Sequence, residues 1–389
     1  MAEGSDGLCS PAEGASLPDL LGARKLEDGI GLALSGGGFR AMLFHLGAFV
    51  RLNEAGMLPK LNRIASVSGG SIAAGALAVA WEGLDFDANG VASNLIEQVA
   101  KPILSLAQWH VDIPAITLGF LPFVSAANVA AAVYDAVLFK RKTLQDLPVK
   151  PVFMFTATSL QTGGLWRFSR EYAAEWHVGK WPAPGLRIAL AVGASAAFPP
   201  FLSPARFTVP SGSFVELEGA NLTFAPYTTR LSLTDGGVYD NLGLEPLWKR
   251  YRTILVSDAG LKTPALPKPW GNWLSVSKRA TDLALQQGID MRTRVLFGLE
   301  VIKQRTLVHW GIGRGVADYK NGNPLEFSDE ATKSASRVAT RLTRLPAEVQ
   351  NLVMKAGYAH TDAALRASHF LGPACPPPSF DGLPLLRAH

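Results

Sequence analysis

Residues 30–81 read IGLALSGGGFRAMLFHLGAFVRLNEAGMLPKLNRIASVSGGSIAAGALAVAW, and this stretch decides the fold. It contains two short apolar runs, at 30–35 and 64–67, and a glycine-containing turn follows each run. Each turn leads into a segment with the spacing or composition of a helix, at 42–56 and 71–81. Strand, turn and helix that recur in this order are typical of parallel strands. The sequence therefore predicts an α/β fold.

Later segments extend this pattern. We expect strands at 152–158, 231–234 and 254–257, and a small-residue helix at 188–197 that Pro199 ends. A long helix is expected over 331–367, with four basic residues along one face: Lys333, Arg337, Arg341 and Arg344. No internal repeat or interdomain linker interrupts the chain. We therefore expect one large domain at 29–372, between a flexible tail at 1–28 and a Pro-rich tail at 373–389.

The composition excludes several classes of protein. Apolar residues make up 48% of the 389 residues and charged residues 18%, which is too apolar for a disordered chain. The net charge, 37 − 32 = +5, is small, and we find no basic patch or reader motif, so we expect no nucleic-acid partner. Cys9 and Cys375 are too few for a disulfide framework or a four-ligand zinc site. The first 28 residues lack the features of a signal peptide, so a cytoplasmic location is expected.

The first glycine turn, Ser35-Gly36-Gly37-Gly38-Phe39-Arg40, has the features of an anion site. Backbone N–H groups converge there, and the dipole of the following helix adds partial positive charge. Such a turn suits a phosphate or a developing oxyanion. The Gly-Lys-Ser/Thr ending of a P-loop is absent, which argues against a nucleotide-binding enzyme. A cation at Arg40 opposes the helix dipole, which favours a nearby ligand. The alternative is a plain tight turn with a solvated arginine.

The second turn, Ser66-Val67-Ser68-Gly69-Gly70, places a serine between a strand and a helix. A nucleophilic serine on such an elbow needs small neighbours because the backbones come close. The alternative for Ser68 is an ordinary helix N-cap. Asp235, followed by two glycines after a short strand, has room to face a site. The alternative for Asp235 is an Asp-Gly turn. No histidine after Ser68 stands in a motif that would complete a triad.

Together, the two turns and the Asp235-Gly236-Gly237 segment resemble the patatin-like phospholipases, in that family's chain order. Further similar stretches are 194–200 (ASAAFPP), 240–243 (DNLG) and 357–362 (GYAHTD), so the resemblance covers about residues 29–367. Two positions depart from the family pattern. Ala41 stands at the final glycine of the first turn, and Ser66 at the first glycine of the elbow. Both replacements are small, so they affect loop geometry more than chemistry.

The resemblance implies a three-layer α/β/α sandwich around a mainly parallel sheet, and a Ser–Asp dyad in place of a triad. Ser68 would be the nucleophile and Asp235 the base, with Gly37, Gly38 and Arg40 at the oxyanion hole. It implies a lipid acyl hydrolase, of the phospholipase A or lysophospholipase kind, that needs no cofactor or metal and acts on phospholipid or other acyl-ester lipids. Alternatives are a neutral acylglycerol lipase or general esterase, and a catalytically weak lipid- or phosphate-binding protein on the same scaffold.

Residues 113–134 carry no charged side chain. Their length would permit a bilayer span, although Pro114, Gly119 and Pro122 interrupt the first half. Three interpretations remain: two buried helical pieces of the core, a transmembrane segment, or an interfacial flap beside the active site. In the flap, Phe120, Phe123 and their neighbours would meet the surface of a lipid aggregate. The chain would then be a peripheral membrane protein.

Overall fold

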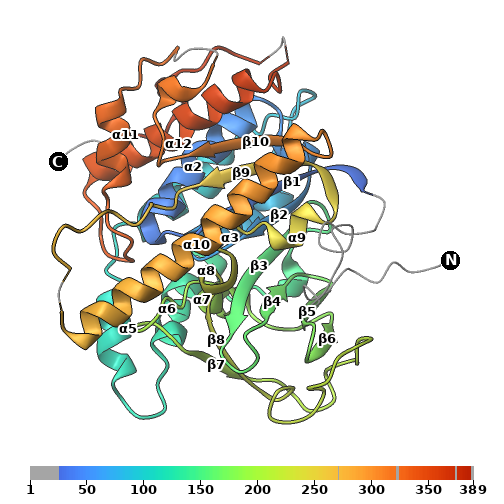
Figure 1. The fold of residues 1–389 in the computed structure, drawn as a ribbon. Helices are drawn as coiled ribbons and strands as arrows, with labels where there is room; N and C mark the ends of the chain where they lie inside the picture. The colour runs from blue at the N-terminus through green and yellow to red at the C-terminus, as the bar shows by residue number, and fades with distance from the viewer. Residues whose placement is uncertain (1–25, 270, 321–323, 373–374, 387–389) are drawn as a thin grey trace.

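A computed structural model describes residues 26–269, 271–320, 324–372 and 375–386. Within these ranges ten strands form one sheet (Figure 1). Five neighbouring strands are parallel, in the spatial order β10 (Thr306–Gly311), β9 (Tyr251–Asp258), β1 (Glu27–Leu34), β2 (Leu61–Ser66) and β3 (Val152–Ser159). The remaining strands are antiparallel: β4 (Leu165–Phe168), β5 (Tyr172–Glu175), β6 (Gly179–Pro182), β7 (Ala205–Thr208) and β8 (Arg230–Asp235).

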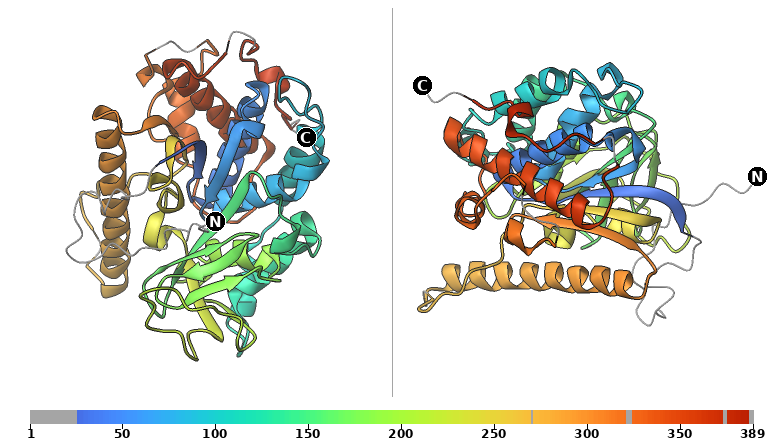
Figure 2. Two further views of the ribbon diagram at one scale, coloured as in Figure 1. Left: turned by 90° about the vertical axis from the view of Figure 1, so that its right-hand side faces the viewer. Right: turned by 90° about the horizontal axis from the view of Figure 1, so that it is seen from above.

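Helices cover both faces of the sheet, as the view from above in Figure 2 shows. On one face lie α2 (Gly38–Glu54), α3 (Gly69–Ala80) and α12 (Ala347–Ala367). On the other lie α8 (Gly237–Asp240), α9 (Glu245–Trp248) and the long α10 (Trp273–Val301). The remaining helices are α4 (Lys101–Leu106), α5 (Asp112–Gly119), α6 (Ala126–Tyr134), α7 (Ile188–Ser195) and α11 (Asp329–Ser336). The fold is thus mixed α/β with a mostly parallel central sheet, as the sequence predicted.

The apolar run of β1 explains this layering. Leu32 and Leu34 are fully buried in the core that α2, α3 and α12 share. Ala33, between them, is buried in a second core on the opposite face, with Leu247 of α9 and Leu296 of α10. Because side chains alternate along a strand, a continuous apolar run fits only a strand that is covered on both sides. β1 is therefore a central strand.

The predicted helix over 331–367 is wrong in its middle. α11 ends at Ser336 and α12 begins at Ala347, with an irregular connection between them. Pro346 occupies the N-cap of α12. A continuous helix is disfavoured at this position, because proline cannot donate the backbone hydrogen bond that the helix would need there. Arg337, Arg341 and Arg344 consequently lie in the connection and not along a helix face.

Both predicted tails overlap ordered structure. β1 begins at Glu27, three residues before the expected start, whereas positions 1–25 of the N-terminal tail lie outside the described residues. Residues 375–386 of the Pro-rich tail pack against the domain. Leu383 is buried in the main core, and Asn351 of α12 exchanges two hydrogen bonds with the backbone of Leu386. The Pro-rich segment therefore belongs to the domain as far as Leu386.

Candidate active site

Ser68 lies on a strained turn between β2 and α3. Its backbone has φ 53° and ψ −122°, in a region that residues with a side chain rarely adopt. Although Ser68 holds the N-cap position of α3, its side chain makes no capping hydrogen bond. The turn packs tightly against the glycine loop, since a Cβ at Gly69 would overlap the carbonyl oxygen of Gly38. Ser68 therefore occupies the N-cap position without capping the helix through its side chain, and its hydroxyl is not used by α3.

Asp235 ends β8, which pairs with β3 in antiparallel register. Its backbone is held on both sides: the amide donates to Ala197 O at 3.0 Å, and the carbonyl accepts the Thr158 hydroxyl at 2.9 Å. The side chain is buried, with 2% exposure. Burial raises the pKa of Asp235 to about 7, and hydrogen bonding from the Gly237 amide and the Ser68 side chain partly opposes that rise. Such a carboxylate is a far better base than an exposed one.

The two oxygens of the Asp235 carboxylate differ in their partners. Oδ1 accepts the Gly237 amide at 2.7 Å, whereas Oδ2 is buried without a hydrogen bond of good geometry. The Ser68 hydroxyl lies beside this carboxyl, and hydrogen bonding from the Ser68 side chain lowers the pKa of Asp235. The structure thus brings the two sequence-predicted residues together, and Oδ2 has an open lone pair with which to take a proton.

The glycine loop reaches the same place from the end of β1. A Cβ at Gly36 would lie 3.1 Å from the Cβ of Ser68. Gly37 and Gly38 have φ of 146° and 60°, which favour glycine, and within the described residues their amides have no hydrogen-bond acceptor. Both amides lie at the N-terminus of α2, where the helix dipole favours negative charge. They are thus available for an anion, although their part in an oxyanion hole stays a prediction.

Comparisons with known proteins indicate the family of this chain. The family model for patatin-like phospholipases matches residues 32–248. The chain belongs to the patatin-like phospholipase family. Human GIVD cytosolic phospholipase A2 is similar in structure, with a TM-score of 0.50 and 11% identity, over 88% of this chain and 60% of that chain. VipD from Legionella pneumophila matches with a TM-score of 0.37 and 15% identity, over 88% and 67%. No curated protein matches the chain significantly.

Arg40 is more buried than the sequence suggested. Its guanidinium donates to Ala259 O from Nε and Nη2, at 3.2 and 3.0 Å, and to Val338 O from Nη1 at 2.6 Å. Burial lowers the pKa of Arg40 to about 10, and the charge of Asp258 partly opposes this effect. Nη2 still lies close to Gly37, where a Cβ would be 3.0 Å away. In this patatin-like chain Arg40 braces the glycine loop from behind, and its direct contact with an oxyanion stays a prediction.

Sequence reasoning missed the role of Ser195, at the end of α7. Its hydroxyl accepts the backbone N–H of Ser68 at 2.9 Å and lies 2.8 Å from the hydroxyl of Ser71. Ser71 in turn donates to Ser66 at 3.0 Å, so Ser66 completes a buried chain of hydroxyls next to the Ser68 turn. Ser195 also accepts the Gly236 amide through its carbonyl. It therefore contacts both the Ser68 turn and the segment after Asp235, and only its place in the family-like 194–200 stretch pointed to it.

Histidines are engaged elsewhere. His45 lies within α2, where its ring nitrogens contact Ser257 Oγ at 2.8 Å and Ser35 O at 2.9 Å. Burial lowers its pKa to about 4, so it is neutral near pH 7. In the described part of the chain no histidine hydrogen-bonds to Ser68 or Asp235, and no three His, Cys, Asp or Glu side chains gather as metal ligands.

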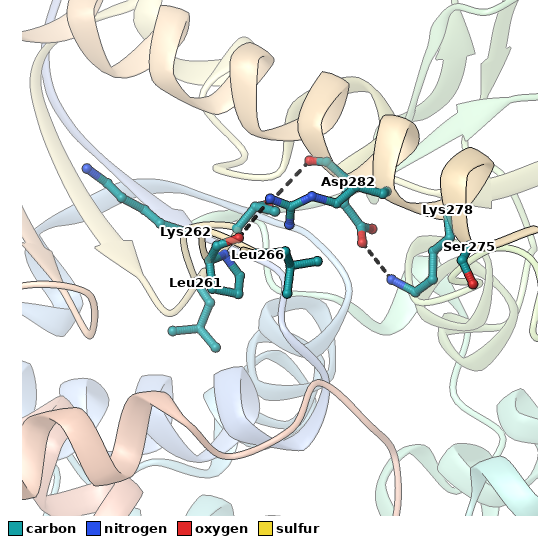
Figure 3. A pocket seen from close by; sticks show the side chains of 9 residues that line it. Leu261, Lys262, Leu266, Ser275, Lys278 and Asp282 are labelled. Carbon is teal, nitrogen blue, oxygen red and sulfur yellow. Dashed lines mark hydrogen bonds and ion pairs between the residues drawn. The ribbon is translucent and has the colours of Figure 1, made fainter. Parts of the chain in front are cut away.

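An open groove of about 420 Å³ lies apart from the dyad, between the segment after β9 and the first turns of α10 (Figure 3). It begins two residues after Ala259, the residue that Arg40 contacts. Across it, Arg279 donates to Pro264 O at 2.8 Å, while Lys278 pairs with Asp282 on the same helix at 2.6 Å. Because neither Ser68 nor Asp235 lines this groove, it is not where the ester would react.

Proposed function

We propose that this patatin-like chain is a lipid acyl hydrolase that cleaves carboxylic esters through Ser68 and Asp235. The observation that carries the proposal is the strained turn at Ser68 beside a buried carboxylate whose Oδ2 has no donor. Because burial raises the pKa of Asp235 to about 7, the carboxylate is basic enough to accept a hydroxyl proton near neutral pH. Family membership supports this reaction class.

In the first half-reaction Ser68 Oγ attacks the ester carbonyl carbon while its proton passes to Asp235 Oδ2. The resulting oxyanion lies at the amides of Gly37 and Gly38, and each such donor typically contributes about 10²–10³ in rate. The bond to the lipid alkoxide then breaks, and the alkoxide takes the proton from Asp235. An acyl-Ser68 ester and a free alcohol remain.

In the second half-reaction Asp235 removes a proton from water, whose oxygen attacks the acyl carbonyl. When the bond to Ser68 Oγ breaks, the proton on Asp235 returns to Ser68 and a fatty acid leaves. One carboxylate therefore serves as base and acid in both halves. The shuttle needs no metal ion or cofactor, and the backbone contacts of Asp235 keep its side chain in one position throughout.

The exposed turn between α5 and α6 supports a lipid surface as the partner. Phe120 is 83% exposed and Phe123 fully exposed, while Ala115 alone is buried in α5. α6, by contrast, buries a small-residue face in the core, so the core interpretation holds for the second half of residues 113–134. No helix in the described residues is long and apolar enough to cross a membrane. We propose that the α5–α6 turn inserts shallowly into a lipid surface and that the protein binds membranes peripherally.

A fluorophosphonate probe tests the proposed reaction. It should label Ser68 covalently, and labelling and hydrolysis of a short-chain p-nitrophenyl ester should be lost in Ser68→Ala and Asp235→Asn. The matched control is Ser93→Ala, at an exposed serine outside the proposed site, which should be labelled like the wild type. A folded wild type that is neither labelled nor active would instead favour the lipid-binding alternative. Retention of more than about a tenth of the activity in either variant would contradict the dyad, because loss of a general base costs more.

A further inference from the structure

Three arginines in the connection between α11 and α12 have no role in the dyad chemistry. Arg337, Arg341 and Arg344 are all exposed. None forms an ion pair or side-chain hydrogen bond with another described residue. Residues 331–347 contain no aspartate or glutamate, so nothing in this segment neutralises the three charges. Their guanidinium groups are therefore available to an external anion.

The connection is tied directly to the glycine loop. The Phe39 amide donates to Arg341 O at 3.0 Å, and Arg40 Nη1 donates to Val338 O at 2.6 Å. Arg341 also lies against Gly38, because a Cβ on Gly38 would be 2.6 Å from Arg341 O and 2.9 Å from Arg341 N. The backbone of Arg341 is thus in van der Waals contact with the predicted oxyanion hole, while its side chain is exposed.

On its other side the connection meets the start of α5. Leu342 O accepts the amide of Val111 at 2.8 Å, and the Leu345 amide donates to Ala107 O at 3.0 Å. α5 leads to the exposed apolar turn at 120–124. The backbone of the connection therefore joins the loop beside Ser68 to the helix that leads to the exposed apolar turn. In a phospholipid the phosphate lies only a few bonds from the ester carbonyls, because glycerol joins them. When an ester carbonyl is at Ser68, the phosphate would therefore be close to this connection.

We infer that Arg341, flanked by Arg337 and Arg344, binds the phosphate of the lipid substrate and selects phospholipids over neutral acylglycerols. This inference rests on the proposed function. A guanidinium matches a phosphate with paired hydrogen bonds, and such charge-assisted bonds are about twice as strong as neutral ones. Arg40 cannot take this role, because its guanidinium is buried and donates to Ala259 and Val338.

Mixed micelles of a nonionic detergent test this inference, because the substrate is then the only component with a phosphate. The ratio of kcat/KM on phosphatidylglycerol to kcat/KM on diacylglycerol should exceed one in the wild type. In Arg341→Gln that ratio should fall about tenfold or more, through KM rather than kcat. Arg341→Lys keeps the charge but not the paired hydrogen bonds, so its ratio should fall between those of the wild type and Arg341→Gln. Arg294→Gln, at an exposed arginine of α10 without a described ion pair, is the matched control and should keep the ratio.

Three outcomes separate the possibilities. Equal losses on both lipids in Arg341→Gln would overturn the inference and show a structural role. Unchanged selectivity, in a protein whose Ser68 is still labelled, would overturn it while leaving the proposed hydrolase intact. Inhibition of diacylglycerol hydrolysis by millimolar inorganic phosphate, without any preference for phosphatidylglycerol, would assign the arginines to free phosphate instead. The wild-type preference should also weaken as NaCl rises from 50 to 500 mM, because exposed charges are screened.

Discussion

The charge of Asp235 should destabilise the folded protein above neutral pH, and Asp235→Asn should remove that cost. Burial raises the folded-state pKa from 3.8 to about 7. As pH rises, the unfolded chain therefore releases this proton first, and the folded state loses stability between pH 3.8 and 7. Each pKa unit corresponds to about 1.36 kcal/mol. Between pH 5 and pH 8, ionisation of Asp235 alone should lower the free energy of unfolding of the wild type by about 2–3 kcal/mol. An amide at this position does not titrate, so Asp235→Asn should not show this loss.

Thermal unfolding at pH 5 and pH 8 measures this difference. With an unfolding entropy of about 2.1 cal/mol/K per residue, the 389-residue chain has about 0.8 kcal/mol/K, so about 2–3 kcal/mol moves Tm by about 3 °C. The Tm of Asp235→Asn relative to the wild type should therefore rise by about 3 °C between the two pH values. Glu218→Gln, at an exposed carboxylate without a described ion pair, controls for the loss of one charge. A difference that stays constant, or shrinks at pH 8, would refute the desolvation argument.

Three other predictions concern activity. On a soluble ester, kcat/KM should fall about tenfold per pH unit below an inflection near pH 7, because Asp235 must be ionised to act as the base. A value of kcat/KM that stays constant down to pH 5 would contradict this prediction. His45 cannot produce the inflection, because its pKa is about 4. Ser195→Ala should lower kcat about tenfold without moving that inflection, because the Ser68 amide loses its hydrogen-bond acceptor. Ser195→Thr keeps a hydroxyl and should restore part of the rate. Phe120→Ser with Phe123→Ser should weaken liposome binding and vesicle hydrolysis but not soluble-ester turnover; equal losses on both substrates would assign the turn to the core.

The central fold and the two turns that carry Ser68 and Asp235 could be predicted because their signals are local, whereas the pairing of the two residues as a dyad came from the family resemblance and stays a prediction. The apolar run before the glycine turn specifies a strand buried on both faces, and the helix that follows is specified by spacing within a few turns. The small residues around Ser68 indicate a close approach of backbones, which the contact between Gly69 and Gly38 confirms. Asp235-Gly236-Gly237 marks a strand end in the same way.

What could not be predicted depends on residues far apart in the sequence. Arg40 is buried because Ala259 and Val338, more than 200 positions away, supply its acceptors. The partner of the Ser68 amide is 127 positions away, at Ser195. The break between α11 and α12 does have a local signal, because Pro346 is typical of the start of a helix and not of its interior. The predicted continuous helix would also have placed Arg341 on a helix face and not in the connection that contacts the glycine loop.

Two arginines of similar chemistry meet the same loop in opposite environments, and burial separates their roles. Arg40 approaches from the interior, where desolvation lowers its pKa and backbone carbonyls take up its donors, so it fixes the position of Gly37 and Val338. Arg341 approaches from the surface, where its backbone fixes Phe39 and its guanidinium remains available. Loop geometry therefore depends on the buried cation and on a main-chain bond, neither of which involves the exposed side chain. For this reason we expect a substitution of the Arg341 side chain to change the proposed preference for a phosphate-bearing lipid while leaving the glycine loop beside Ser68 in place.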